Sequence, residues 1–162
     1  MATFPRKSDT LTSLTGKAPA SVTVFHVGPK DQDLNVLKEI VRRTDFKMCP
    51  GTSWRLAETD DFGAVTGMLE DRGVPIVVCE HDAGGGDWKN ILARVVAFPT
   101  PPVMIVASRT ADEYLWAEAL NLGAYDVLSK PYSATEVERV LSMAWLRWAH
   151  RPLPVATLAQ AC

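Results

Sequence analysis

Five short apolar segments alternate with amphipathic helical patterns, and this alternation restricts the fold more than any other feature of the chain. The clearest apolar segments are residues 75–79 and 103–107, which contain no charged residue. Strands without polar alternation are typical of parallel sheets that are covered by helices on both faces. The pattern therefore predicts a single α/β domain in which a strand and a helix follow each other five times.

Three further segments complete the set of predicted strands. Residues 22–27 form an apolar strand that ends at Gly28, residues 54–57 are a weaker candidate, and residues 125–128 are short. Helical periodicity follows each strand. We expect N-caps at Asp31 and Thr59, and capping boxes that begin at Thr110 and Ser133.

The bulk composition is that of an ordinary globular protein of one domain. The chain has 162 residues, 47% of them hydrophobic, and a net charge of −2, which gives no electrostatic argument for binding nucleic acid or an anionic membrane. No apolar run approaches the roughly 18 residues of a membrane span. Three cysteines without a CxxC pair indicate free thiols in a reducing cytoplasm. We expect a flexible segment at residues 1–20, a domain at 21–150 and a tail at 151–162.

The segment from Pro102 to Pro131 resembles the receiver domain of response regulators in two-component signalling. It contains an apolar strand that leads to Ser108, a helix closed by Gly123, and a short strand followed by Lys130. The gap from Ser108 to Gly123 matches the family spacing. The resemblance covers residues 21–148 and implies a flavodoxin-like, doubly wound (βα)5 sandwich of three layers, with parallel strand order 2-1-3-4-5. We expect no output domain to follow, so that the chain looks like a divergent stand-alone member.

The resemblance also places the phosphorylation pocket on this sequence. In the family an aspartate after the third strand accepts the phosphoryl group, and two acidic residues after the first strand help to hold Mg²⁺. The acceptor position falls on Glu80, with Asp82 as the alternative, and the acidic pair falls on Gly28 and Pro29. Asp33 lies too far along the chain, where the first helix should begin. The acidic pair is therefore lost, Mg²⁺ would bind weakly, and we expect no resident cofactor or metal.

Two phosphoryl-contacting groups of the family are kept, at Ser108 and Lys130, and the resemblance implies a cis peptide bond before Pro131. Without the acidic pair, Lys130 should find its nearest partner in Glu80. Such an ion pair would imitate the contact between the lysine and a phosphorylated aspartate, and it would fix the domain in one state. The aromatic residue that reports the switch in the family falls on Val127.

The fourth predicted helix offers a candidate partner face. Tyr114, Trp116 and Leu120 lie outside its inner stripe, which is formed by Ala111, Leu115, Ala119 and Leu122. An exposed aromatic patch would bind another protein, whereas the alternative is packing against the fifth helix or the tail. The expected partners are a histidine kinase, another receiver or a scaffold protein, and a homodimer through the fourth and fifth helices is a further expectation.

Three functions stay open at this point. The first is an atypical receiver with a degraded pocket, which takes part in phosphorelay signal transduction by binding proteins and is not an enzyme. The second is a working phosphoacceptor with a modified acceptor site, and the third is a flavodoxin-like cofactor-binding protein. The glycine run at residues 84–86 is interpreted as a flexible turn, and His26 and Cys79 as core residues.

Overall fold

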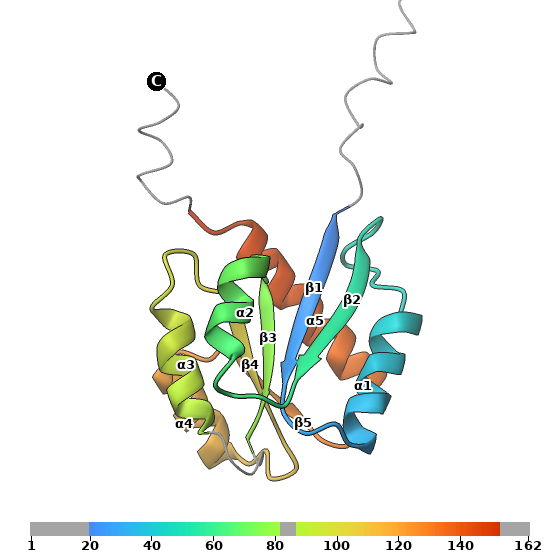
Figure 1. Cartoon of the computed structure of the whole chain (residues 1–162). Coiled ribbons are helices and arrows are strands. Elements are labelled where there is room, and N and C mark those ends of the chain that lie inside the picture. The colour runs from blue at the N-terminus through green and yellow to red at the C-terminus, as the bar shows by residue number, and fades with distance from the viewer. Residues whose placement is uncertain (1–19, 82–86, 153–162) are drawn as a thin grey trace, which may run out of the picture.

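The computed structural model of the chain describes residues 20–81 and 87–152 (Figure 1). Within these ranges five parallel strands form one sheet in the order β2-β1-β3-β4-β5, so the predicted flavodoxin-like fold and strand order are confirmed. The strands are β1 (Ser21–Val27), β2 (Ser53–Thr59), β3 (Ile76–Glu80), β4 (Val103–Ser108) and β5 (Asp126–Ser129).

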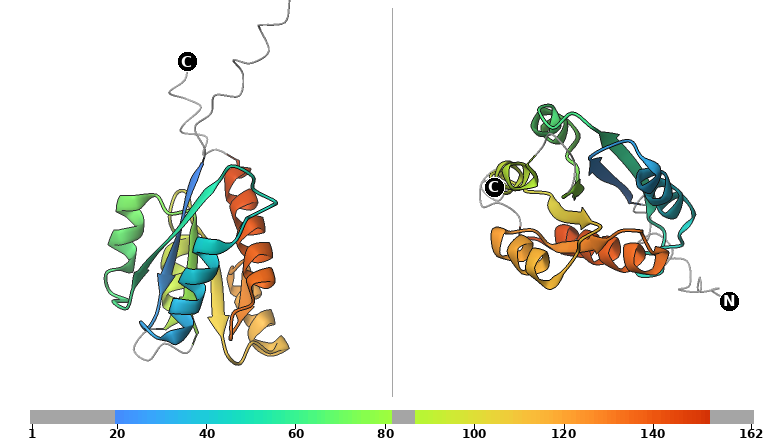
Figure 2. Two further views of the ribbon diagram at one scale, coloured as in Figure 1. Left: turned by 90° about the vertical axis from the view of Figure 1, so that its right-hand side faces the viewer. Right: turned by 90° about the horizontal axis from the view of Figure 1, so that it is seen from below.

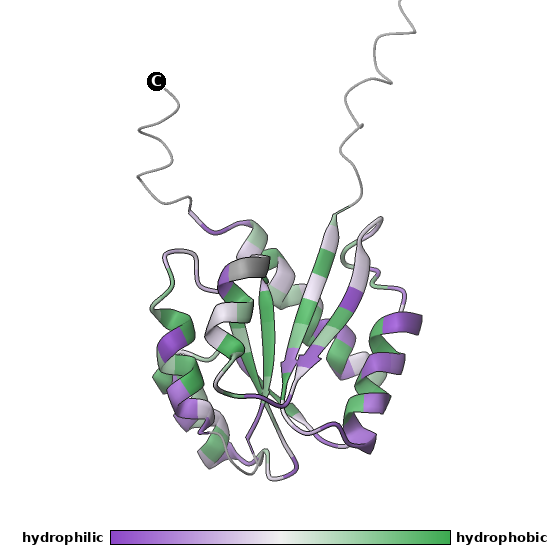
Figure 3. Cartoon of the chain, viewed as in Figure 1, coloured by the Kyte–Doolittle hydropathy of each residue, from purple (hydrophilic) through white to green (hydrophobic). Residues whose placement is uncertain are grey.

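Helices cover the sheet on both faces (Figure 2). The helices are α1 (Gln32–Arg43), α2 (Val65–Arg72), α3 (Trp88–Val96), α4 (Glu113–Leu122) and α5 (Ala134–Ala149). Buried residues of α1 and α5 pack on one face, and buried residues of α2, α3 and α4 pack on the other. Figure 3 shows the central strand β3 as almost uniformly apolar, while α1 turns polar residues outward. Within the described ranges, no helix is long and apolar enough to span a lipid bilayer.

Two of the predicted helix starts are wrong. Thr59 does not cap a helix, because it is the last residue of β2 and pairs with Val27. The Asp61 carboxylate then holds a turn by accepting from the amide of Gly63 at 2.9 Å, and α2 begins only at Val65.

Thr110 is the second wrong start, because the N-cap of α4 is Asp112, whose carboxylate accepts from the Leu115 amide at 2.8 Å. The predicted cap at Asp31 is confirmed by a 3.0 Å bond from the Leu34 amide. Ser133 stands at the N-cap of α5 but makes no side-chain capping bond.

Candidate functional site

The carboxyl edge of the sheet gathers the polar residues that the sequence singled out. Glu80 is the last residue of β3, Ser108 is the last residue of β4, and Lys130 follows β5 directly. The Lys130 amide donates to the Ser108 carbonyl at 3.0 Å, and the Lys130–Pro131 peptide bond is cis, as expected. In open α/β sheets this edge is the usual place for a ligand site.

The Glu80 carboxylate is buried and contacted by three donors. Its side chain is 2% exposed. His26 Nε2 and Tyr132 Oη each donate to Oε1 at 3.0 Å, and Lys130 Nζ lies 2.5 Å from Oε2. The ion pair expected between Glu80 and Lys130 is therefore present, and the position is not a solvated loop carboxylate. Among the described residues, Oε1 accepts two hydrogen bonds, and Oε2 has the Lys130 ion pair but no hydrogen bond.

These contacts also set the protonation state of the cluster. Burial acts to raise the pKa of Glu80, but the hydrogen bonds from His26 and Lys130 and the charge of Lys130 outweigh it, so the pKa lies below its ordinary value. Burial and the adjacent Glu80 raise the pKa of Tyr132. Near neutral pH, Glu80 is therefore an anion and Tyr132 is a neutral donor.

Gly28 supplies the space that the Glu80 side chain needs. A Cβ atom added at Gly28 would lie 2.3 Å from Glu80 Cγ and 2.8 Å from Glu80 Cβ, distances that real Cβ atoms essentially never show. Gly28 is also one of the two positions where the resemblance puts the acidic pair. The absence of a side chain at position 28 and the length of the Glu80 side chain are thus coupled by packing.

Asp33 enters the site, which corrects the expectation that it lies too far along the chain. Because α1 begins at Gln32, its first turn stands over the carboxyl edge and brings Asp33 Oδ2 to 3.6 Å from Lys130 Nζ. Arg109 forms an ion pair with the same oxygen. Charges therefore alternate from Glu80 through Lys130 and Asp33 to Arg109.

The described residues of this edge do not fit a Mg²⁺ ion. Mg²⁺ prefers one or two carboxylates that remain free to coordinate it, together with water and phosphate oxygens. Gly28 and Pro29 provide no carboxylate, Glu80 is enclosed by its donors, and Asp33 is paired with two cations. Across residues 20–81 and 87–152 no group of three His, Cys, Asp or Glu side chains could hold a metal ion.

Ser108 is fully buried at the same edge. Its Oγ accepts from the Thr110 amide at 3.1 Å and lies 3.2 Å from Thr110 Oγ1 and 3.3 Å from His81 Nδ1. The hydroxyl therefore shapes the turn after β4. Asp82 and the glycine run at 84–86 lie outside the described residues.

Sequence reasoning missed two of the three donors to Glu80. His26 was interpreted as a core residue, and it is fully buried, but its imidazole also binds a carboxylate. Tyr132 was not singled out at all. Two signals were available: a histidine inside an otherwise apolar strand, and a tyrosine directly after the Lys130–Pro131 pair.

The candidate partner face on α4 is partly as expected. Tyr114 is 80% exposed and Trp116 is 50% exposed, with Trp116 Nε1 donating to Asp126 Oδ1 at 3.2 Å. Leu120 is only half-buried. Leu122, predicted on the inner stripe, is 48% exposed because α4 ends there and the chain reverses at Gly123 in the left-handed conformation.

Solved structures show what this fold is similar to. No protein-family model matches the chain, and no curated protein sequence matches it. A signal receiver domain of an HD domain-containing protein from Pseudomonas fluorescens Pf-5 has 22% identity and a TM-score of 0.66, covering 81% of this chain and 99% of that chain.

Two further structures give the same result. The signal receiver domain of a DNA binding response regulator from Colwellia psychrerythraea 34H has 14% identity and a TM-score of 0.62, over 77% of this chain and 98% of that one. The Francisella response regulator 1452 receiver domain has 17% identity and a TM-score of 0.59, over 78% and 98%. At these identities the likeness shows a shared fold: the chain has the fold of signal receiver domains, as the resemblance predicted.

Proposed function

We propose that this chain is an atypical receiver domain that signals by binding other proteins and does not take up a phosphoryl group at its pocket. The observation that carries the proposal is the buried Glu80 carboxylate, which His26, Lys130 and Tyr132 hold from three sides. The receiver fold of the similar structures supports the wider signalling role.

The geometry of Glu80 argues against nucleophilic attack on a phosphodonor. A nucleophile must approach phosphorus in line, with an oxygen lone pair free to attack. Oε1 of Glu80 already accepts two hydrogen bonds, Oε2 is ion-paired, and the side chain is 2% exposed. The carboxylates that would recruit Mg²⁺ are missing or paired. The proposal is therefore that the protein is not an enzyme and uses no cofactor.

The ion pair between Glu80 and Lys130 supports a domain that stays in one state. In the family the lysine contacts the phosphorylated acceptor, and here an internal carboxylate occupies Lys130 permanently. A receiver of this kind would present one fixed surface to its partners. Signalling would then depend on when the protein is made and where it binds.

The partners that fit this role are a histidine kinase, another receiver or a scaffold protein. Tyr114 and Trp116 are exposed large aromatic side chains on α4, and such residues carry much of the binding energy of protein interfaces. A homodimer through α4 and α5 would use the same face. The role would place the protein in the cytoplasm, where the buried Cys49 and Cys79 would stay free thiols.

Intact-mass spectrometry after incubation with acetyl phosphate and Mg²⁺ tests the proposal. We expect no gain of a phosphoryl group by the folded protein, under conditions in which an ordinary receiver domain is phosphorylated. A gain that disappears in the Glu80→Gln variant would instead establish the modified phosphoacceptor. A bound flavin or nucleotide in the purified protein would favour the cofactor-binding alternative.

A further inference from the structure

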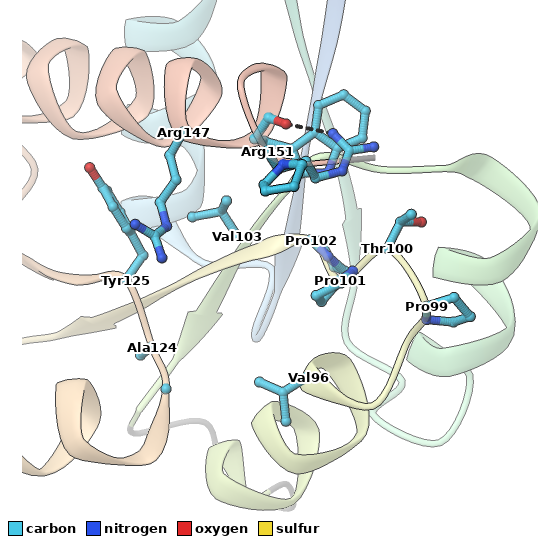
Figure 4. Close-up of a pocket in the computed structure, with 13 residues that line it drawn as sticks. Val96, Pro99, Thr100, Pro101, Pro102, Val103, Ala124, Tyr125, Arg147 and Arg151 are labelled. Atoms are coloured by element: carbon cyan, nitrogen blue, oxygen red, sulfur yellow. Dashed lines mark hydrogen bonds between the residues drawn. The ribbon is translucent and has the colours of Figure 1, made fainter. Parts of the chain in front are cut away.

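A cavity of about 610 Å³ lies at the edge of the sheet opposite to Glu80. It is formed where the chain enters β4 and β5 and where α5 ends (Figure 4). The apolar part of its walls includes three of its four prolines and several small side chains: Val96, Pro99, Pro101, Pro102, Val103 and Ala124. Its volume lies within the range of about 300–1,000 Å³ that is typical of small-molecule sites.

The charge of this cavity is positive and unbalanced. Arg147 and Arg151 line it, and its described lining contains no Asp or Glu. No carboxylate in the described part of the chain forms an ion pair with either guanidinium. Each arginine instead lies over an aromatic ring, Arg147 over Tyr125 at 5.8 Å and Arg151 over Trp148 at 3.5 Å. Within residues 20–81 and 87–152, both guanidinium groups therefore lack an anionic partner.

Two buried donors at the same place lack an acceptor. Trp148 Nε1 and Arg151 Nε are both buried without a hydrogen-bond partner among the described residues. Arg151 stacks on the Trp148 indole and donates from Nη1 to the Trp148 carbonyl. Figure 4 draws this hydrogen bond of Arg151 as a dashed line. Buried polar groups are normally hydrogen-bonded, so two orphaned donors side by side indicate a place for an acceptor.

We infer that this cavity binds a small amphiphilic anion, with an apolar body and a single carboxylate head. The head accepts from Arg147 and Arg151 at the rim, because charge-assisted bonds to guanidinium are the strongest that the cavity offers. Movement of Arg151 toward the head uncovers the Trp148 indole and frees both orphaned donors. The apolar body packs against Val96, Ala124 and the prolines.

The site is separate from the proposed signalling pocket. Its residues lie around the starts of β4 and β5 and at the end of α5, whereas Glu80 and Lys130 lie at the ends of β3 and β5. The inference goes beyond the proposed function and does not depend on it. A ligand bound in this cavity would be a signal input that is independent of the pocket around Glu80.

NMR titration of the full chain with 4-phenylbutyrate tests the inference. We expect saturable shifts of the Gly123 and Tyr125 amides and the Trp148 indole, assigned with Trp148→Phe. The neutral 4-phenylbutanamide and acetate serve as controls, since one lacks the charge and the other lacks the apolar body. The double variant Arg147→Gln/Arg151→Gln should bind at least about tenfold more weakly, because two charge-assisted bonds are lost.

Arg139→Gln is the matched control variant, since Arg139 is an exposed arginine of α5 that does not line the cavity. It should bind like the unmodified chain. Val96→Trp should block the cavity, and Val96 is 47% exposed, so the larger side chain leaves the core intact. Unchanged amide spectra elsewhere establish that the variants are folded.

Three outcomes would overturn the inference. The first is equal binding of the acid and the neutral amide, and the second is undiminished binding by the double arginine variant. The third is binding only after apolar residues of segment 153–162 are replaced by aspartate, as in Leu153→Asp/Val155→Asp. That result would identify the chain's own segment as the occupant of the cavity.

Discussion

Replacing Glu80 by glutamine perturbs the buried ion pair with the least change of shape. The amide keeps the volume of the side chain but removes the charge that Lys130 contacts at 2.5 Å. Loss of one partner from a buried ion pair costs about 3–5 kcal/mol of unfolding free energy. Asp33 lies 3.6 Å from the same ammonium group and offers a second carboxylate, so we expect the lower end, about 3 kcal/mol.

The double variant tests whether this loss comes from the pair itself. Among the described residues, Lys130→Met alone leaves the Glu80 anion with the hydrogen bonds from His26 and Tyr132 but without its ammonium partner, and it should cost a similar amount. In Glu80→Gln/Lys130→Met no unpaired charge stays buried at this contact. The combined loss should therefore be smaller than the sum of the single losses by at least about 1 kcal/mol, as expected for residues in contact.

Equilibrium urea unfolding at neutral pH measures these free energies, with m-values compared to establish the same two-state transition. Lys30→Met is the matched control, because Lys30 pairs with Asp60 at 3.8 Å with both side chains more than half exposed. Such surface pairs contribute little, so no clear change is expected. If Glu80→Gln were within about 0.5 kcal/mol of the unmodified protein, or if the single losses simply added, the buried pair would not hold the pocket together.

Three further predictions use the same protein. Gly28→Ala should lower the unfolding free energy by about 1–3 kcal/mol, because the added Cβ would overlap Glu80 Cγ. The control Gly67→Ala should not lower the unfolding free energy, because a Cβ at Gly67 meets open space. The folded-state pKa of Glu80 lies below the ordinary 4.5, so its contribution is present above that pH and is lost as the pH falls through the folded pKa. Urea titrations should show the difference from Glu80→Gln shrinking with acid, and a constant difference would contradict this. In the Cys162→Ser variant, iodoacetamide should modify neither Cys49 nor Cys79 before the protein unfolds. Burial raises the pKa of both thiols, that of Cys79 to about 12. Rapid labelling of the folded protein would show that the core opens.

The strands were predictable because apolar runs without alternation have few other uses in a chain of this length. The first residues of the helices were harder to predict. Thr59 and Thr110 both have the local pattern of an N-cap, but Thr59 pairs with Val27 in the sheet and the Thr110 hydroxyl contacts Ser108. The Thr59 hydroxyl accepts from the Asp61 amide at 3.1 Å and the Thr110 hydroxyl lies 3.2 Å from Ser108 Oγ, so neither hydroxyl caps a helix. A local pattern cannot show that competition.

Some residues of the candidate site were also predictable from the sequence, and others were not. Glu80, Ser108 and Lys130 could be located from strand ends alone, because parallel strands end at one edge of a sheet. Asp33 could not, since its distance along the chain from β1 says nothing about how the first turn of α1 is oriented. The role of His26 also depended on a partner 54 residues away.

The packing of Gly28 against Glu80 couples substitutions at these two positions. An acidic side chain at position 28 places its Cβ where Glu80 Cγ already lies, so that substitution alone disrupts the core before it creates a metal ligand. Shortening Glu80 to aspartate alone withdraws the carboxylate from His26, Lys130 and Tyr132 and leaves buried donors without an acceptor. Each single substitution therefore lowers stability, and only a combined change at both positions avoids the clash.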